Sequence, residues 1–274
     1  MGRKRKAQPV VPVVKSRKRA RKIVTQFHKV NDALAILEDD VNLTLVDKEA
    51  RRSRLQESLN ALGGRAAYQS ASQLSVSFHS TSKWVLARLQ AMGIVRMQTA
   101  PSLSPSQPSQ KPRLLEVGAI TTTLLDCPAV QTTAIDLLSR HARIQQIDFF
   151  HLPQPPLFTF DVIVASMVIN SLPTASARGD FLRRCHAFLE ASKGHLFLIL
   201  PSSCLTHSKY MTVEKFRSLV TTRVGFAVVE EKWTPKTVAF VLRASGKCVD
   251  EGRLTAGRKK VTSSSWAKKF DILL

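Results

Sequence analysis

The stretch LLEVGAITTT, residues 114–123, decides the fold. A short apolar run stands directly before a single glycine, Gly118, which is typical of a buried strand that runs into a turn. Loops that bind dinucleotides usually carry several glycines at this point, so that the backbone can approach a phosphate closely. Because Gly118 is the only glycine of the stretch, the turn favours a ligand without a pyrophosphate.

Short apolar runs continue after this stretch and alternate with segments that suit helices. The runs are rich in Val, Ile, Leu and Phe without clean alternation, which is typical of strands covered on both faces. We therefore predict an α/β fold. The predicted strands are 113–118, 132–136, 143–148, 161–169, 195–201, 226–233 and 237–244, and the predicted helices among them are 175–192 and 213–223.

The rest of the chain divides by composition. Helical spacing of apolar residues predicts helices at 28–40, 46–63 and 82–93, and residues 98–112 hold four prolines and four serines. The expected segments are a basic disordered arm at 1–27, a helical region at 28–97, a Pro/Ser linker or loop at 98–112, the α/β domain at 113–244 and a basic tail at 245–274.

The positive charge is concentrated at the two ends of the chain. The net charge is +21, and residues 1–22 hold ten Lys or Arg and no acid. Such runs are typical of a nuclear or nucleolar address, or of an arm that lies along nucleic-acid phosphates. A solubilising tail is the simpler alternative. RNA or DNA is the expected partner.

Other classes of protein are disfavoured. No apolar run approaches the roughly 18 residues that span a bilayer, so no membrane association is expected. The four cysteines lie far apart and form no CxxC pair. This argues against a zinc site or a disulfide framework, and we expect no metal.

Acidic residues stand at the ends of successive predicted strands. Asp136 follows Gly118 by eighteen residues, near the spacing of an acid that binds ribose hydroxyls. Asp148 ends the next strand and suits an exocyclic amine, and Phe149 or Phe150 suits stacking on a purine. S-adenosylmethionine has a ribose and an adenine but no phosphate, so it fits this pattern. Simpler interpretations stay open, namely a plain turn at Gly118 and a helix N-cap at Asp136.

Several blocks together resemble one family, the fungal 25S ribosomal RNA adenine-N1 methyltransferases. The resemblance covers roughly residues 28–243, and the segment QLSVSFHSTSKW at 73–84 departs from the family's pattern. The blocks are LLEVGAI (114–120), IDLLSR (135–140), QQIDFF (145–150), FDVIVASMVINSLP (160–173), RGDFL (178–182) and LFLILPSSCLTHSKYM (196–211).

The resemblance implies a class I methyltransferase fold, with a seven-stranded, mostly parallel sheet that has helices on both faces. It implies S-adenosylmethionine as cofactor, with Gly118 and Asp136 as the principal contacts and Glu116 near the cationic end of the cofactor. It also implies methylation of an adenine N1 in large-subunit ribosomal RNA, in the nucleus or nucleolus, by a monomer that acts on RNA or a pre-ribosome. A metazoan relative that resembles a cofactor sensor leaves an alternative, a sensor that acts through a protein partner.

Neutral adenine N1 already has a lone pair, so its methylation needs no strong base. Asn170 is the candidate that holds the adenine edge, since Asn and adenine have matching donors and acceptors. A turn-forming Asn before Pro173 is the alternative. Tyr210 is a candidate for stacking on a flipped base, or else a buried aromatic. Further candidates for the RNA side are His207 and Lys209. Arg178, Arg183 and Arg184 are candidates for phosphate contacts, and solvated residues on a helix face are the simpler alternative.

Overall fold

The computed structural model describes residues 16–39, 43–64, 67–68, 70–71, 81–95, 110–139, 141–153, 159–245 and 270–274. The chain forms two compact units, Met1–Ser80 and Thr81–Leu274. Residues 98–109 of the expected linker at 98–112 lie outside the described residues, and so do residues 73–80 of the segment at 73–84 that departs from the family's pattern. No helix within the described part of the chain is both long and apolar enough to cross a bilayer.

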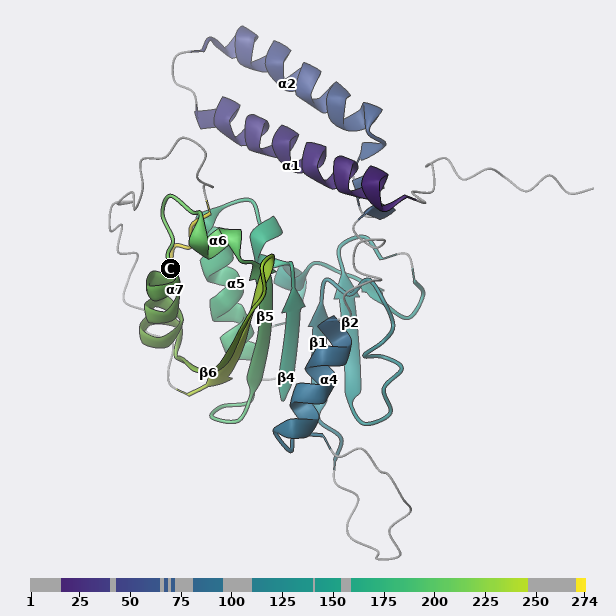
Figure 1. Ribbon diagram of the computed structural model, residues 1–274, viewed down its shortest axis with the longest axis vertical. Coiled ribbons are helices and arrows are strands. Elements are labelled where there is room, and N and C mark those ends of the chain that lie inside the picture. Colours follow the sequence, from purple (N-terminus) through teal and green to yellow (C-terminus); the bar gives the residue numbers. More distant parts are fainter. Residues whose placement is uncertain are drawn as a thin grey trace, which may run out of the picture. The chain divides into compact units, whose positions relative to one another are not determined.

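The first unit is built on two helices, α1 (Arg17–Asp39) and α2 (Leu45–Ala61) (Figure 1). Ala20 and Ile23 of α1 are buried against Ala67 and Ala71. The prediction that the whole of 1–27 is disordered is therefore wrong for residues 17–27. Ala20 and Ile23 extend the apolar face of α1 toward its amino end, although this part of the sequence is rich in Lys and Arg.

The second unit contains a seven-stranded sheet in the order β3-β2-β1-β4-β5-β7-β6 (Figure 1). β7 is antiparallel to both of its neighbours, whereas the remaining pairs are parallel. The chain passes from β3 to β4 across β1, so the order reverses between β1 and β4. The strands are β1 (Arg113–Val117), β2 (Gln131–Asp136), β3 (Gln145–Gln146), β4 (Val162–Ser166), β5 (His195–Pro201), β6 (Phe226–Trp233) and β7 (Thr237–Ala244).

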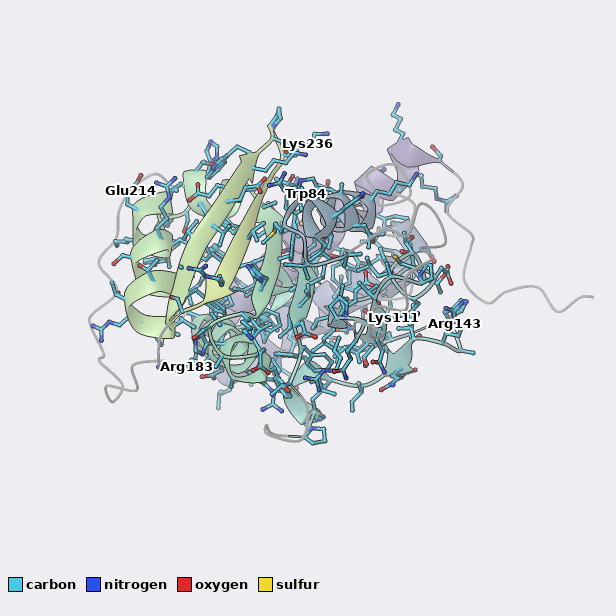
Figure 2. The ribbon with its side chains drawn as sticks, turned by 90° about the horizontal axis from the view of Figure 1, so that it is seen from below. Trp84, Lys111, Arg143, Arg183, Glu214 and Lys236 are labelled. Carbon is cyan, nitrogen blue, oxygen red and sulfur yellow. The ribbon has the colours of Figure 1, made fainter. Side chains whose placement is uncertain are left out.

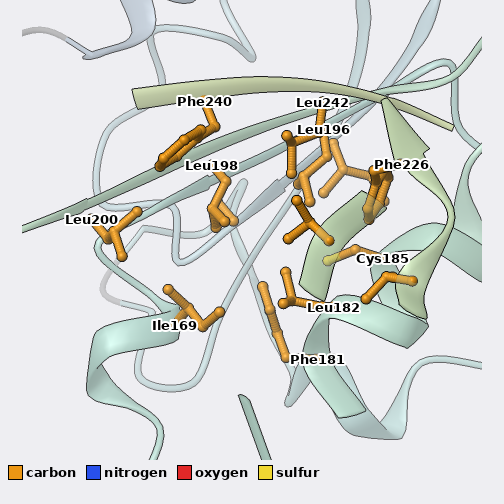
Figure 3. Packing of buried hydrophobic residues seen from close by; sticks show 14 of the residues in the cluster. Ile169, Phe181, Leu182, Cys185, Leu196, Leu198, Leu200, Phe226, Phe240 and Leu242 are labelled. Carbon is orange, nitrogen blue, oxygen red and sulfur yellow. The ribbon is translucent and has the colours of Figure 1, made fainter. Parts of the chain in front are cut away.

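Helices cover both faces of this sheet. One face packs in a large cluster with α5, whose Phe181, Leu182 and Cys185 lie close to Leu196 and Leu198 of β5 (Figure 3). The central strands β4 and β5 are apolar on both faces because each face is buried, as the sequence predicted, whereas the edge strands β3 and β6 carry exposed polar residues. The helical elements of this unit are α4 (Thr81–Ala91), η1 (Phe149–His151), η2 (Ile169–Ser171), α5 (Ala175–Phe188), α6 (Ser203–Thr206), α7 (Val213–Ser218) and η3 (Leu219–Val224).

The helix α4 belongs to the sheet unit, although we expected it in the helical region at 28–97. Val85 and Leu89 are fully buried in a cluster with Leu114, and the ring of Trp84 lies edge-on to Phe197 at 5.8 Å between centroids (Figure 2). We grouped α4 with the other helices because its sequence is helical, but its apolar residues pack on the face of the sheet that carries Leu114 and Phe197.

The expected basic tail at 245–274 contains a structured end. Residues 270–274 pack on the sheet unit, with Phe270 and Ile272 buried in the large cluster. Residues 246–269 lie outside the described residues. The three apolar residues after Asp271 were too short a run to predict as part of the core.

We expect Leu89→Ala to lower the free energy of unfolding of the sheet unit by about 2 to 5 kcal/mol, because it leaves a cavity between α4 and the sheet. Urea unfolding of the full chain measures this effect. Gln90→Ala, at the exposed neighbouring position, is the control. Equal losses for the two variants would contradict the packing of α4 on the sheet.

Candidate active site

The turn after β1 is shaped by Gly118. Its φ of +74° lies in the left-handed region, and a Cβ on it would approach Val168 Cγ2 to 2.7 Å. The amides of Gly118 and Ala119 both donate to the carbonyl oxygen of Ile135, at 2.9 and 3.0 Å. A glycine is therefore required both by the backbone conformation and by the approach of the segment after β4.

Glu116 is a buried acid on β1, two residues before Gly118. Strand alternation places it on the same face as Leu114, and it is only 8% exposed. Burial raises the pKa of its carboxyl group from 4.5 to about 7. Its Oε2 atom has no hydrogen-bond partner among the described residues. A cationic ligand group beside it would compensate for the burial of the carboxylate.

Asp136 lies at the end of β2, next to the Gly118 turn. Its carboxylate accepts a hydrogen bond from the amide of Leu138 at 2.8 Å. Leu137–Ser139 form a turn without helical structure, so the helix N-cap that we considered is not formed. The structure thus brings Gly118 and Asp136 together on neighbouring strands, as predicted from their order.

Asp148 lies close to Asp136, because the amide of Ile147 donates to the carbonyl oxygen of Asp136 at 3.2 Å. Its carboxylate accepts from the amide of Phe150 at 2.9 Å and caps η1. Phe149 is 5% exposed and packs on Phe181 at 4.9 Å between ring centroids. The predicted stacking of Phe149 on a purine is therefore wrong, because its ring lies in the core. Phe150 is half-buried and keeps this role as a prediction.

The segment after β4 contains a strained residue that sequence reasoning missed. Met167 has a φ of +61°, which is rare for a residue with a long side chain, and it is 40% exposed. Its amide donates to the carbonyl oxygen of Ile199 at 2.8 Å, and Ser171 Oγ donates to its carbonyl oxygen at 3.1 Å. The expected strand at 161–169 ends at Ser166 for this reason.

Asn170 follows on η2. Its Oδ1 is buried and has no hydrogen-bond partner among the described residues, and its Nδ2 lies 3.4 Å from Ser171 Oγ. A buried carboxamide oxygen without a hydrogen-bond partner is unusual in a folded protein and is a candidate to bind a polar ligand edge.

The segment after β5 lies at the same edge of the sheet. Tyr210 is half-buried, and its carbonyl oxygen accepts from Lys215 Nζ at 3.3 Å. His207 is exposed, with Nδ1 2.7 Å from Thr206 Oγ1. Lys209 is half-buried. The three candidates for the RNA side therefore share one short segment.

Two arginines of α5 bind the protein itself, which corrects the expectation that they contact phosphate. Arg178 donates to the carbonyl oxygens of Leu172 and Asp271 at 2.7 and 3.0 Å. Arg184 donates to the carbonyl oxygens of Phe149 and Leu152. Each guanidinium thus holds a loop at the site. Arg183 lies 3.5 Å from Asp180 (Figure 2 labels its position).

The described residues contain no group of three or more His, Cys, Asp or Glu side chains that could hold a metal ion.

The strand order and the glycine at the switch point define a class I methyltransferase domain. Residues 53–272 match the model of the family described as 25S rRNA (adenine(2142)-N(1))-methyltransferase, Bmt2. Since the match covers most of the chain, the protein belongs to this family.

Two curated proteins are similar in sequence. The 25S rRNA adenine-N(1) methyltransferase of Schizosaccharomyces pombe is 32% identical over 184 residues, which cover 64% of this chain and 66% of the relative. The 25S rRNA (adenine(2142)-N(1))-methyltransferase of Saccharomyces cerevisiae is 27% identical over 168 residues, which cover 57% of this chain and 44% of the relative. The chain thus spans just under two thirds of the first relative and under half of the second.

One solved structure with a similar fold is the O-methyltransferase NcsB1 from neocarzinostatin biosynthesis. It is 15% identical, has a TM-score of 0.42, and the match covers 69% of this chain and 61% of NcsB1. A similarity this low supports no conclusion about function.

We expect Gly118→Ala to destabilise the protein by about 1 to 3 kcal/mol, because it combines a strained backbone with overlap on Val168. Gly93→Ala is the matched control, since Gly93 has a φ of +70° and open space around its Cβ position. Val168→Ala in the Gly118→Ala background should recover part of the loss. Equal thermal shifts for the two glycine variants would show that the overlap does not matter.

Glu116 should make the protein without ligand less stable as the pH rises. The folded state holds its proton up to about pH 7, whereas the unfolded chain releases it near 4.5. Ionisation between these values therefore favours unfolding, by up to about 3 kcal/mol. Chemical unfolding across this window measures the slope, and Glu116→Gln should flatten it. Glu57→Gln, on the exposed surface of α2, is the control. An unchanged slope in Glu116→Gln would contradict the shifted pKa.

Proposed function

We propose that this protein uses S-adenosylmethionine to methylate N1 of an adenine in 25S ribosomal RNA. The match of residues 53–272 to the family carries the proposal. The names of the two curated relatives agree on the substrate and on the methylated atom. The geometry of the carboxyl edge of the sheet gives independent support.

The residues at this edge fit S-adenosylmethionine. The buried carboxyl of Glu116, whose Oε2 has no hydrogen-bond partner among the described residues, suits the cationic amino-acid end. Gly118, two residues further on, has no side chain in the turn after β1. Asp136 and Asp148 then serve the ribose hydroxyls and the adenine amine, with Phe150 against the purine. When bound, the cofactor supplies a methyl group on a sulfonium.

The chain's own residues orient the target base. Asn170 Oδ1 can accept a hydrogen bond from the exocyclic amine of adenine, which holds the Watson–Crick edge toward the site. Adenine N1 uses a lone pair that it already has, so positioning and stabilisation of the cationic product are the main requirements. A paired adenine must first be flipped out, and we propose that Tyr210 stacks on the flipped base.

The basic ends of the chain serve attraction to RNA. The ten Lys or Arg of residues 1–22 include several on α1, where they are held on a helix. We propose that the protein acts as a monomer on ribosomal RNA or a pre-ribosome in the nucleolus, as part of ribosome biogenesis. Binding that depends on phosphate contacts weakens steeply as salt rises.

Transfer of labelled methyl groups to an unmodified large-subunit RNA transcript tests this function. We expect label in RNA and a reverse-transcription stop at one adenine, because N1-methylation blocks the Watson–Crick edge.

Asp136→Ala should weaken cofactor binding by about 1.5 to 3 kcal/mol through loss of charge-assisted hydrogen bonds. Asp126→Ala is the matched control, since Asp126 is an exposed acid in the segment between β1 and β2 that pairs with Arg143.

The other outcomes identify the alternatives. Cofactor binding without transfer to RNA would contradict the enzyme and favour a sensor that acts through a protein partner. Transfer to a small molecule that persists without residues 1–15 would favour a small-molecule methyltransferase. This deletion removes five of the ten basic residues of 1–22 without cutting α1, which begins at Arg17.

A further inference from the structure

A short segment, Phe270–Leu274, crosses α5 in direct backbone contact. Phe270 and Ile272 are buried, and the amide of Leu273 donates to the carbonyl oxygen of Ala175 at 3.0 Å. A Cβ on Gly179 of α5 would overlap the carbonyl oxygen of Leu273 and lie 2.7 Å from its carbonyl carbon. We call Phe270–Leu274 the strap. Gly179 is the residue that lets the strap lie against α5.

Arg178 connects the strap to the loop after β4. One end of its guanidinium donates to the carbonyl oxygen of Asp271 at 3.0 Å, and the other donates to the carbonyl oxygen of Leu172 at 2.7 Å. The guanidinium carbon also lies 5.0 Å from the centre of the Phe270 ring. Leu172 follows η2, which carries Asn170, so one side chain ties the strap to the loop of the candidate base-binding residue.

Ser208 makes a second connection, to the segment after β5. Its buried hydroxyl donates to the carbonyl oxygen of Phe270. The same hydroxyl accepts from the amides of Tyr210 and Met211, each at 3.2 Å. The strap therefore orients the Ser208 hydroxyl, and this hydroxyl holds the turn that carries Tyr210.

We propose that the strap is a positioning element for the RNA side of the site. It sets the loop of Asn170 and the turn of Tyr210 relative to each other, through Arg178 and Ser208. The inference rests on the proposed function for its catalytic consequence. The residues proposed for the cofactor lie on other segments, namely Gly118 in the turn after β1, Asp136 at the end of β2 and Asp148 in the segment after β3.

A purely space-filling role would need only the apolar side chains of the strap. The links to the two loops are polar, and they use the strap's backbone carbonyl oxygens at Phe270 and Asp271. Both loops lie outside the strands of the sheet, and these tethers join them to the strap. Displacement by about 1 Å at a reacting group can reduce a rate by about 100-fold.

Gly179→Ala in the full-length protein tests the inference. Ala favours a helix more than Gly does, so α5 itself should not be weakened. We expect the strap to be displaced, kcat for methyl transfer to fall by about 10- to 100-fold, and the Kd for S-adenosylmethionine to change less than about twofold. Ser176→Ala, at an exposed position in the same turn region of α5, is the matched control and should keep full activity.

Arg178 variants provide a second test if the strap variant unfolds. Arg178→Met removes both donors and should show the same loss of kcat. Arg178→Lys keeps the charge and can donate to one of the two carbonyl oxygens, so it should recover part of the activity.

Hydrogen exchange separates this inference from the proposed function. In Gly179→Ala, amides at 167–172 and 207–212 should exchange faster, while those of β1 and β2 stay protected. If the wild-type protein transfers no methyl group, the proposed function fails, and the exchange result still decides whether the strap orders the loops. Faster exchange across all strands with weaker cofactor binding would make the strap a core element only and overturn the inference. Unchanged exchange and unchanged kcat would overturn it as well.

Discussion

The close approach of two chain segments at Gly118 is the constraint on which the rest of the site depends. The turn after β1 and the segment after β4 lie so near each other that Val168 leaves room only for a hydrogen atom on the Gly118 Cα. Both segments also contain a left-handed residue, Gly118 and Met167. The strand order reverses between β1 and β4, which is where ligands bind in such sheets. The left-handed conformations of Gly118 and Met167 determine the course of the chain at this point.

Several charged side chains at the carboxyl edge of the sheet are buried or bind the protein itself. Glu116 is buried without a partner among the described residues, so its carboxyl group is costly to ionise until a cation is near. Arg178 and Arg184 of α5 donate to backbone carbonyl oxygens and so hold loops in place. Most of the positive charge lies near the two ends of the sequence, since residues 1–22 carry +10 and residues 243–274 carry +5 of the net +21.

Much of the fold was predictable because buried strands have an apolar composition that can be recognised in a short stretch of sequence. Strands covered on both faces are apolar throughout, and the seven predicted strands all occur, though the one at 143–148 shrinks to two residues and the one at 161–169 ends at Ser166. The placing of Asp136 beside Gly118 was also predictable, since parallel strands that follow one another bring their ends to the same edge. The role of these residues in cofactor binding stays a prediction.

The sequence by itself determined the alternation of strands and helices, the order of the acids at the strand ends and the concentration of charge in the tails, because each of these depends on neighbouring residues. Only the tertiary structure decided that α4 packs on the sheet, that Phe149 lies in the core and that Arg178 holds a loop. These outcomes depend on contacts between residues far apart in the chain, such as Arg178 with Asp271 and Trp84 with Phe197. A local pattern carries no information about which distant surface will cover it.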